Sequence, residues 1–228
     1  MDLGLAGRRA LVTGSSKGIG KAIAAALAAE GARVTICARG ADALGAAEAE
    51  LRRAGADVLA VAADLATDAD WLASYTMNLV VHVRFIRRAL PGMLERGWGR
   101  IVNVASTAAR EPDGPVPTYG PAKAALVNLS KQLANVYSPR GVLTNCVCPG
   151  ITRTEAAMAA AVRRTGRHGD DPRRVFDEYF GPRRPLPAGR FGEPEDTGAL
   201  VALLCSERAA WITGTCIDVD GGWVKSIM

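Results

Sequence analysis

The chain has 228 residues, 49% of them hydrophobic and 22% charged, which is enough for one large domain with a buried core. Aromatic residues make up only 5%, which argues against a nucleic-acid binder that stacks bases on aromatic side chains. The net charge is a mild +5, and no signal peptide or apolar run of membrane-spanning length occurs, so we expect a cytoplasmic protein.

The first third of the chain alternates predicted strands and helices. A strand over residues 10–13 leads into a glycine-rich turn and a helix over 21–30. Strands at 34–38 and 58–63 follow, with a helix between them at 41–54. This βαβαβ order predicts a parallel sheet with right-handed crossovers.

The rest of the chain continues the alternation up to a final strand at 215–219. The predicted elements are a helix at 71–94, a strand at 100–106, a helix at 118–137, a strand at 143–148 and a helix at 194–205. Residues 152–190 read as irregular and arginine-rich, with short helical pieces.

The turn after the first strand has the spacing Gly-x3-Gly-x-Gly, at Gly14, Gly18 and Gly20. Glycines let the backbone approach a phosphate, and a helix N-terminus offers free N–H groups and a positive dipole end. A dinucleotide pyrophosphate is the expected ligand, although the spacing is wider than G-x-G-x-x-G and an ordinary βα turn is the alternative. We see no repeat or linker, so we predict one Rossmann-type α/β domain over residues 1–228, with a doubly wound parallel sheet.

Tyr119 and Lys123 lie four residues apart at the start of a predicted helix, so they share one face. A lysine ammonium beside a phenol lowers the phenol pKa from about 10, which makes Tyr119 a candidate acid or base. Ser106 ends a strand whose carboxyl edge faces the same crevice. An isolated Tyr-x3-Lys is more often a solvated helix face.

Here the match is not isolated, and the chain resembles the short-chain dehydrogenase/reductase family. Ser106 precedes Tyr119 by 13 positions and Asn78 precedes Ser106 by 28, both as in the family. The family's marks occur in order over nearly the whole chain: Thr13-Gly14-x3-Gly18-Ile19-Gly20, Asp64-Leu65, Asn78, Ser106, Tyr119-x3-Lys123, Pro149-Gly150-x3-Thr154 and Asp220-Gly221-Gly222.

The resemblance implies a catalytic set of four residues. Tyr119 would donate a proton to the substrate carbonyl oxygen, and Ser106 would hydrogen-bond the same oxygen. Lys123 would lower the pKa of Tyr119 and hold the nicotinamide ribose, while Asn78 would hold a water that relays protons to Lys123. The positions implied for the cofactor are Gly14, Ser16, Lys17, Gly18, Ile19, Gly20, Arg39, Asp64, Leu65, Tyr119, Lys123, Pro149, Gly150, Ile151 and Thr154. The resemblance also suggests a homotetramer.

The end of the second strand predicts which cofactor is used. An acidic residue there would bind the ribose 2′-OH of NAD, but Ala38 stands in its place and Arg39 follows. Arg39 and Lys17 suit the 2′-phosphate of NADP, so we predict NADP (NADPH). The alternative is two solvated surface cations.

The chain departs from the family between Asp64 and Asn78. Only 14 positions separate them, where relatives have about fifty by family resemblance. The difference corresponds to a helix and the central fourth strand, including an Asn-Asn-Ala-Gly motif that this chain lacks. We predict that the molecule carries a further segment between Ala66 and Trp71; a protein truly shortened there is the alternative, and its activity would be in doubt.

Residues 151–190 form the predicted substrate lid. They carry nine arginines and five acidic residues. This excess of positive charge is typical of a solvated surface. Alternatively, it attracts an anionic substrate, such as an acyl group on an acidic carrier or coenzyme A.

The five cysteines lie in apolar runs, and Cys146 and Cys148 are too close for a zinc or redox CxxC pair. We therefore expect buried free thiols and no metal site. His82 is expected to serve in packing, and His168 to be exposed.

These observations predict an NADP-dependent oxidoreductase that moves hydride between nicotinamide and a ketone or secondary alcohol. By overall resemblance the substrate is of the 3-oxoacyl type. One alternative is a dehydrogenase of a sugar, steroid or secondary-metabolite ketone. The other is a catalytically inactive dinucleotide-binding or scaffold protein.

Overall fold

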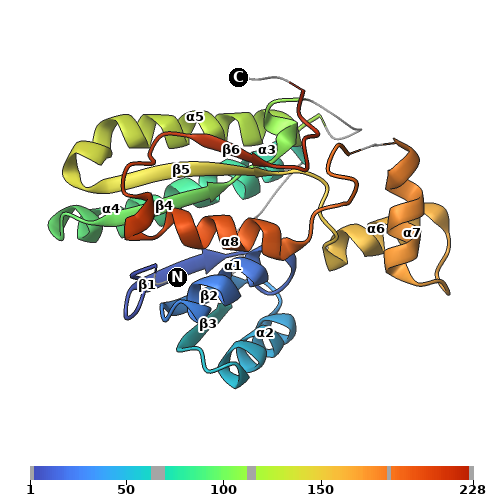
Figure 1. Ribbon diagram of the computed structural model, residues 1–228, viewed down its shortest axis with the longest axis horizontal. Coiled ribbons are helices and arrows are strands. Elements are labelled where there is room, and N and C mark those ends of the chain that lie inside the picture. Colours follow the sequence, from blue (N-terminus) through green and yellow to red (C-terminus); the bar gives the residue numbers. More distant parts are fainter. Residues whose placement is uncertain (1–2, 63–69, 112–116, 184–185, 226–228) are drawn as a thin grey trace. The chain divides into compact units, whose positions relative to one another are not determined.

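The computed structural model describes residues 3–62, 70–111, 117–183 and 186–225, in two compact units (Figure 1). The first unit consists of Met1–Ala63, Gly150–Ala202 and Val219–Met228. The second consists of Asp64–Pro149 and Leu203–Asp218. None of the described helices is long and apolar enough to cross a membrane.

The first unit opens with the predicted βαβαβ arrangement. Its three strands are parallel, in the order β1-β2-β3, and α1 packs on β1 and β2 while α2 packs on β2 and β3. The elements of this unit are β1 (Arg9–Thr13), α1 (Gly18–Ala29), β2 (Arg33–Ala38), α2 (Ala41–Arg53), β3 (Val58–Ala62), α6 (Glu155–Thr165), α7 (Pro172–Phe180), the 3₁₀ turn η4 (Gly181–Arg183) and α8 (Pro194–Leu204).

Alternation along the strands gives this sheet two different faces. Val12, Val34 and Ile36 are buried with the apolar sides of α1 and α2. Leu11, Leu59 and Val61 point the other way, because side chains alternate along a strand, and they are 48%, 57% and 43% exposed. The sheet is therefore well covered on one face and apolar but open on the other.

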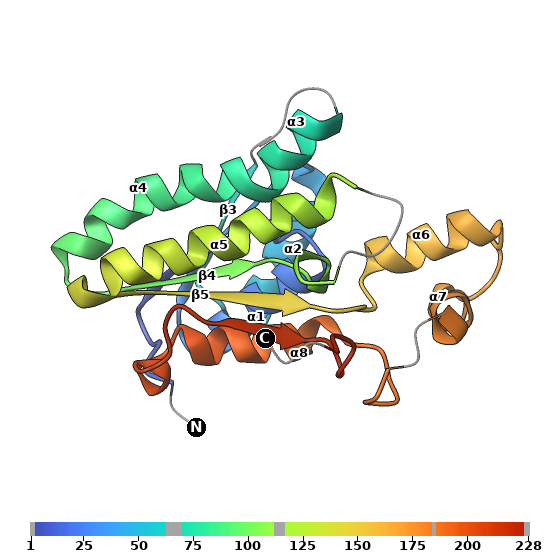
Figure 2. The same ribbon diagram turned by 90° about the horizontal axis from the view of Figure 1, so that it is seen from above.

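The second unit holds the other three strands, in the order β4-β5-β6. Helix α5 packs along β5 and β4, and α4 packs on β4 (Figure 2). Its elements are α3 (Asp70–Tyr75), the π-helical turn η1 (Thr76–Val80), α4 (Val81–Glu95), β4 (Gly99–Val104), the 3₁₀ turn η2 (Thr107–Ala109), α5 (Tyr119–Tyr137), η3 (Ser138–Arg140), β5 (Val142–Pro149), η5 (Glu207–Ala209) and β6 (Cys216–Val219).

The core of the second unit lies between its sheet and its helices. Ile86 of α4, Ile101 of β4 and Val142 of β5 form one buried cluster. All eight residues of β5 are buried, as expected for the middle strand of a parallel sheet. The single helix predicted over 71–94 is in fact α3, η1 and α4 in succession.

Both β1 and β4 are edge strands of their sheets among the described residues. The strand that the family resemblance places between them would come from the predicted extra segment. The predicted break between Ala66 and Trp71 falls largely on residues 63–69, which lie outside the described residues. It therefore stays a prediction.

Candidate active site

The glycine turn of the first unit depends on glycine at three positions. Gly14 and Gly18 have φ of +66° and +58°, in the left-handed region that side chains disfavour. A Cβ on Gly20 would lie 2.3 Å from the carbonyl oxygen of Gly14. The start of α1 is thus packed directly onto the turn that ends β1.

Ser15 fixes this turn to the neighbouring strand. It is fully buried, its hydroxyl donates to the carbonyl of Val12 at 2.7 Å, and it accepts from the amide of Cys37 at 2.9 Å. Ser15 was not among the predicted site residues, although a small polar residue inside the turn, soon after an apolar strand, could have indicated it.

The N-terminus of α1 has the features of an anion site. Lys17 is its N-cap, with no side-chain capping bond, and the first turn holds no acidic residue. Amides of a first helical turn have no partner within the helix, so they suit a phosphate. Lys17 and Arg39 are both exposed, and the described residues show no ion-pair partner for either side chain. These groups fit a dinucleotide with an additional phosphate.

Thr154 is brought to the same turn from far along the sequence. A Cβ on Gly18 would lie 3.2 Å from the Thr154 side chain, whose hydroxyl caps α6 by accepting from the amide of Ala157 at 3.1 Å. Gly150, four residues before Thr154, packs closely against Asp220. A Cβ on Gly150 would lie 2.7 Å from the Cβ of Asp220.

The other predicted cofactor residues are placed as follows. Ser16, Ile19 and Ile151 are partly buried in the first unit, and Pro149 ends β5 in the second. Asp64 and Leu65 lie outside the described residues.

Ser106 and Tyr119 come together in the second unit. Ser106 follows β4 and caps η2 by accepting from the amide of Ala108 at 3.2 Å. Tyr119 is the first residue of α5, and the Ser106 hydroxyl interacts with it and lowers the pKa of its phenol. Strand β4 ends at Val104, before Ser106 rather than at it. The hydrogen bond from the Ala108 amide orients the Ser106 hydroxyl.

The predicted lowering of the Tyr119 pKa is wrong for this structure. Burial raises the pKa of Tyr119, and the neighbouring Ser106 hydroxyl opposes this only in part. Lys123 points elsewhere: its Nζ donates to the carbonyl of Val104 at 2.9 Å and lies 5.7 Å from the centre of the Tyr119 ring. Tyr119 is therefore protonated at neutral pH, the state that a proton donor needs.

Lys123 is itself a buried ammonium, only 8% exposed. Burial lowers its pKa to about 8, and the neighbouring Cys146 and Cys148 oppose that shift. A lysine with a pKa this low exchanges protons readily near physiological pH.

Asn78 lies in the π-helical turn η1, a distortion that often marks functional sites. Its Nδ2 donates to the carbonyl of Ser74 at 2.9 Å, and the Ser74 hydroxyl donates to the carbonyl of Thr118 at 3.2 Å. Asn78 is thereby linked to the residue that precedes Tyr119. Its predicted role with a relay water stays a prediction.

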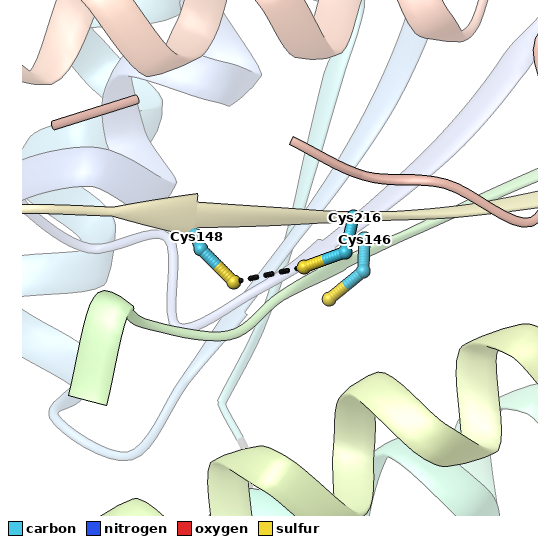
Figure 3. A group of neighbouring side chains, drawn as sticks. All are labelled: Cys146, Cys148 and Cys216. Atoms are coloured by element: carbon cyan, nitrogen blue, oxygen red, sulfur yellow. Dashed lines mark hydrogen bonds between the residues drawn. The ribbon is translucent and has the colours of Figure 1, made fainter. Parts of the chain in front are cut away.

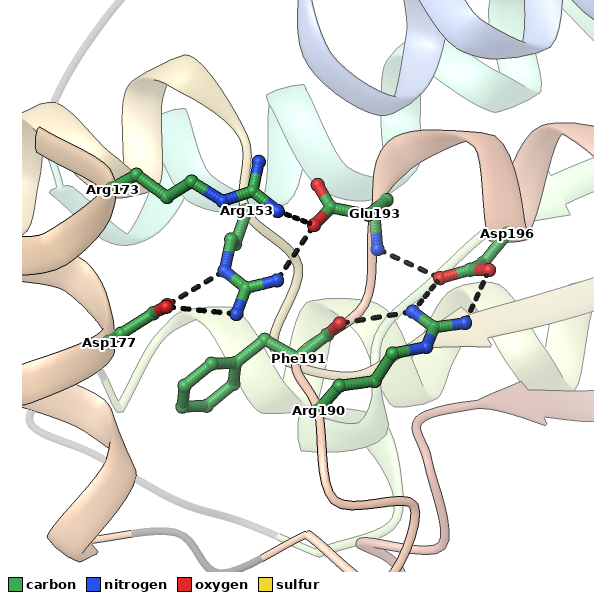
Figure 4. A network of polar contacts seen from close by, with 7 residues as sticks. All are labelled: Arg153, Arg173, Asp177, Arg190, Phe191, Glu193 and Asp196. Carbon is green, nitrogen blue, oxygen red and sulfur yellow. Dashed lines mark hydrogen bonds and ion pairs between the residues drawn. The ribbon is translucent and has the colours of Figure 1, made fainter.

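The arginines of the predicted lid are mostly engaged with acidic residues. Arg153 donates to both carboxylate oxygens of Asp177, at 2.7 and 3.0 Å, and to Glu193 at 2.7 Å (Figure 4). Its guanidinium also lies 5.3 Å from the centre of the Phe191 ring. The remaining ion pairs are Arg173–Glu193, Arg190–Asp196, Arg167–Asp170, Arg167–Glu178, Arg174–Asp170 and Arg174–Glu178. Most of this charge therefore holds α6, α7 and the start of α8 together.

Comparison with known proteins decides the family. A family model described as short chain dehydrogenase matches residues 8–72, and one described as enoyl-(acyl carrier protein) reductase matches residues 62–224. The chain belongs to the short-chain dehydrogenase/reductase family. It is therefore an oxidoreductase that acts on CH–OH or ketone groups, with a Rossmann-type fold.

Individual relatives are similar to this chain over almost its whole length. It is 34% identical to D-beta-hydroxybutyrate dehydrogenase of Cupriavidus necator over 257 aligned positions, covering 96% of this chain and 99% of the relative. It is 31% identical to a 3-oxoacyl-acyl-carrier-protein reductase of Aquifex aeolicus, covering 97% and 99%. Among solved structures, L-sorbose reductase of Gluconobacter frateurii, complexed with NADPH and L-sorbose, matches with a TM-score of 0.91 and 32% identity over 100% of both chains.

Proposed function

We propose that this short-chain dehydrogenase/reductase is an NADPH-dependent reductase of ketones, with 3-oxoacyl thioesters as its preferred substrates. The observation that carries the proposal is the interacting pair of Ser106 and Tyr119, with buried Lys123 one helical turn away. This is a protonated acid held beside a second donor, as carbonyl reduction requires.

Four residues have separate roles in the proposed reduction. Ser106 hydrogen-bonds the substrate carbonyl oxygen, and Tyr119 gives that oxygen its proton as negative charge develops on it. Lys123 resupplies the proton to Tyr119, and Asn78 connects Lys123 to solvent through water. The nicotinamide supplies the hydride when bound.

The cofactor preference rests on Arg39 and Lys17. Both side chains are exposed and available to a 2′-phosphate, and buried Ala38 offers no carboxylate to a ribose diol. The solved structure of L-sorbose reductase contains NADPH, which supports the same choice here. The turn at Gly14–Gly20, with Thr154 beside it, would hold the pyrophosphate.

One relative supports an acyl substrate, since it is named for 3-oxoacyl groups on a carrier protein. The relative named for hydroxybutyrate supports only the 3-hydroxy pattern of the substrate, since hydroxybutyrate is a free acid. Arg163 and Arg164, in the last turn of α6, are exposed and form no ion pair with an acidic side chain among the described residues, so they are available to a carrier or coenzyme A. The likeness to L-sorbose reductase favours a ketose as the second candidate substrate.

A panel of ketones with NADPH tests the proposal. We expect the highest kcat/KM for a 3-oxoacyl thioester, and a lower value for the same thioester when Arg163 and Arg164 are replaced by Glu. Turnover confined to ketoses would establish the second candidate. NADPH binding without turnover of any ketone would identify an inactive binder instead.

Two further expectations belong to this proposal. Residues 151–190 would close over the substrate as a lid of a single domain, and the chain would form a homotetramer. The apolar face of α5 gives little support for assembly, because Leu126 and Leu133 lie within the unit's own core and only Val136, 58% exposed, is left outside. A light-scattering mass of one chain would exclude the tetramer.

A further inference from the structure

Three cysteines that the proposed reaction does not use converge in the second unit. Cys146 and Cys148 are two residues apart on β5, so their side chains share one face of the sheet. Strand β6 brings Cys216 alongside, with the register fixed by the Cys146 amide, which donates to the carbonyl of Thr215 at 2.9 Å. Figure 3 shows the three sulfur atoms on the same side of β5.

The sulfur positions suit a single metal ion. All three Sγ atoms lie within 4.8 Å of one another, and Cys148 and Cys216 are 3.2 Å apart and hydrogen-bonded. Zinc–sulfur bonds of about 2.3 Å in tetrahedral geometry place ligand sulfurs ~3.8 Å apart. The Cys148–Cys216 pair, at 3.2 Å, would open by about 0.6 Å, and no pair would have to close by more than about 1 Å to reach that spacing. All three cysteines are free thiols.

Two cationic side chains interact with these sulfurs. The ammonium of Lys123 interacts with Cys146 and Cys148, and the guanidinium of Arg110 interacts with Cys216. Thiolates are the form that binds metal.

We propose that Cys146, Cys148 and Cys216 bind one divalent zinc-group cation, Zn²⁺ or Cd²⁺, through three thiolates. Water or an added ligand takes the fourth position, as in zinc sites with three protein ligands. Thiols that are still protonated release their protons to solvent, which leaves a site of net charge −1 beside Lys123 and Arg110. The period of two along β5, rather than a CxxC spacing, is what brings the ligands together.

Cadmium titration of the reduced, metal-free chain tests this site. The protein is kept in a phosphine reductant, and five free thiols are counted before cation is added. We expect one Cd²⁺ per chain, an ultraviolet sulfur-to-cadmium charge-transfer band and a higher unfolding temperature, since a ligand that binds only the folded state stabilises it. Zn²⁺ should compete for the same site.

Matched variants locate the ligands. Cys148→Ala and Cys216→Ala should each weaken Cd²⁺ binding by more than about 10-fold, because even outer-shell changes cost that much. Cys37→Ala and Cys205→Ala, at cysteines outside the cluster, should keep the full stoichiometry and the band. If the unsubstituted protein binds no more Cd²⁺ than Cys148→Ala does, the three thiols serve only in packing and the proposal is overturned. Should an alanine variant fail to fold, cadmium NMR of the unsubstituted protein decides, and a shift outside the range of three-sulfur coordination contradicts the site.

Discussion

At the scale of single residues, burial decides the protonation of the candidate catalytic pair. It raises the pKa of Tyr119 and lowers that of Lys123 to about 8. The sequence spacing placed both residues on one face of one helix, and the structure confirms this. The spacing did not reveal that Lys123 would turn to the carbonyl of Val104, because that partner lies on a strand distant in sequence.

Arg39 is expected to determine the choice between NADPH and NADH. Arg39→Asp removes a partner of the 2′-phosphate and supplies a carboxylate for a ribose diol. A charge-assisted hydrogen bond contributes about 1.5–3 kcal/mol, so kcat/KM for NADPH should fall ~10–100-fold while that for NADH rises. Arg9→Asp is the control: it makes the same charge change at the N-terminal end of the neighbouring strand β1, whereas Arg39 follows the C-terminal end of β2, and it should leave the ratio unchanged. Equal efficiency with both cofactors before any substitution would refute this assignment.

His82 makes stability depend on pH in the acid range. Burial, with a contribution from Lys123, lowers its pKa to about 4 from 6.5, and its Nδ1 has no hydrogen-bond partner among the described residues. Between pH 6.5 and pH 4 the unfolded chain therefore binds more protons at this site, so stability is lost as pH falls through that window. The loss is at most about 3.4 kcal/mol, at 1.36 kcal/mol for each pKa unit.

Urea unfolding at several pH values measures this effect. His82→Gln should flatten the decline between pH 6.5 and pH 4, whereas His168→Gln, at an exposed site, should keep the original slope. An unchanged slope in His82→Gln would mean that other groups cause the acid sensitivity.

At the scale of elements, the strands and most helices were predictable because their apolar patterns are local. The π-helical turn at Asn78 was not predictable from the sequence. It lies at Thr76–Val80, where α3 continues into α4, and no residue type there indicates it. The cluster of three cysteines was not predicted, although the sequence indicates how two of them lie. Alternation puts Cys146 and Cys148 on one face, but Cys216 joins them only through the pairing of β5 with β6.

The packing of α1 onto its turn predicts opposite effects for two Gly→Ala substitutions. In Gly20→Ala the new Cβ would lie 2.3 Å from the Gly14 carbonyl oxygen, so the turn must open. Overpacking of this kind costs ~1–3 kcal/mol, and NADPH affinity should fall with it. Gly45 in the exposed part of α2 has nothing within 4 Å, so Gly45→Ala should stabilise by about 0.5–1 kcal/mol. Thermal unfolding of the two variants checks the contrast, and equal shifts would contradict it.

At the scale of the whole molecule, the first unit's sheet has an apolar face that its own helices leave open. Leu11, Leu59 and Val61 are 48%, 57% and 43% exposed there, and β1 and β4 each end a sheet among the described strands. The alignment with D-beta-hydroxybutyrate dehydrogenase spans 257 positions, more than the 228 residues of this chain. A helix and a strand between Ala66 and Trp71 would account for both observations.

Mass spectrometry of the intact protein from its natural source tests the extra segment. We expect a mass clearly above the 23.9 kDa of the printed sequence. A mass of 23.9 kDa would show that the protein is truly shortened, and the inactive dinucleotide binder would then become the leading interpretation.

The rate of NADPH oxidation with a 3-oxoacyl thioester, compared between the unsubstituted protein and Tyr119→Phe, tests the central claim most directly. The phenol is the proposed proton donor, so its loss should lower kcat ~10²–10⁴-fold, the usual contribution of a general acid. NADPH binding, followed by fluorescence, should be unchanged, because the glycine turn at Gly14–Gly20 is intact. A variant that keeps nearly the original kcat would contradict the account, since the proton would then come from another group.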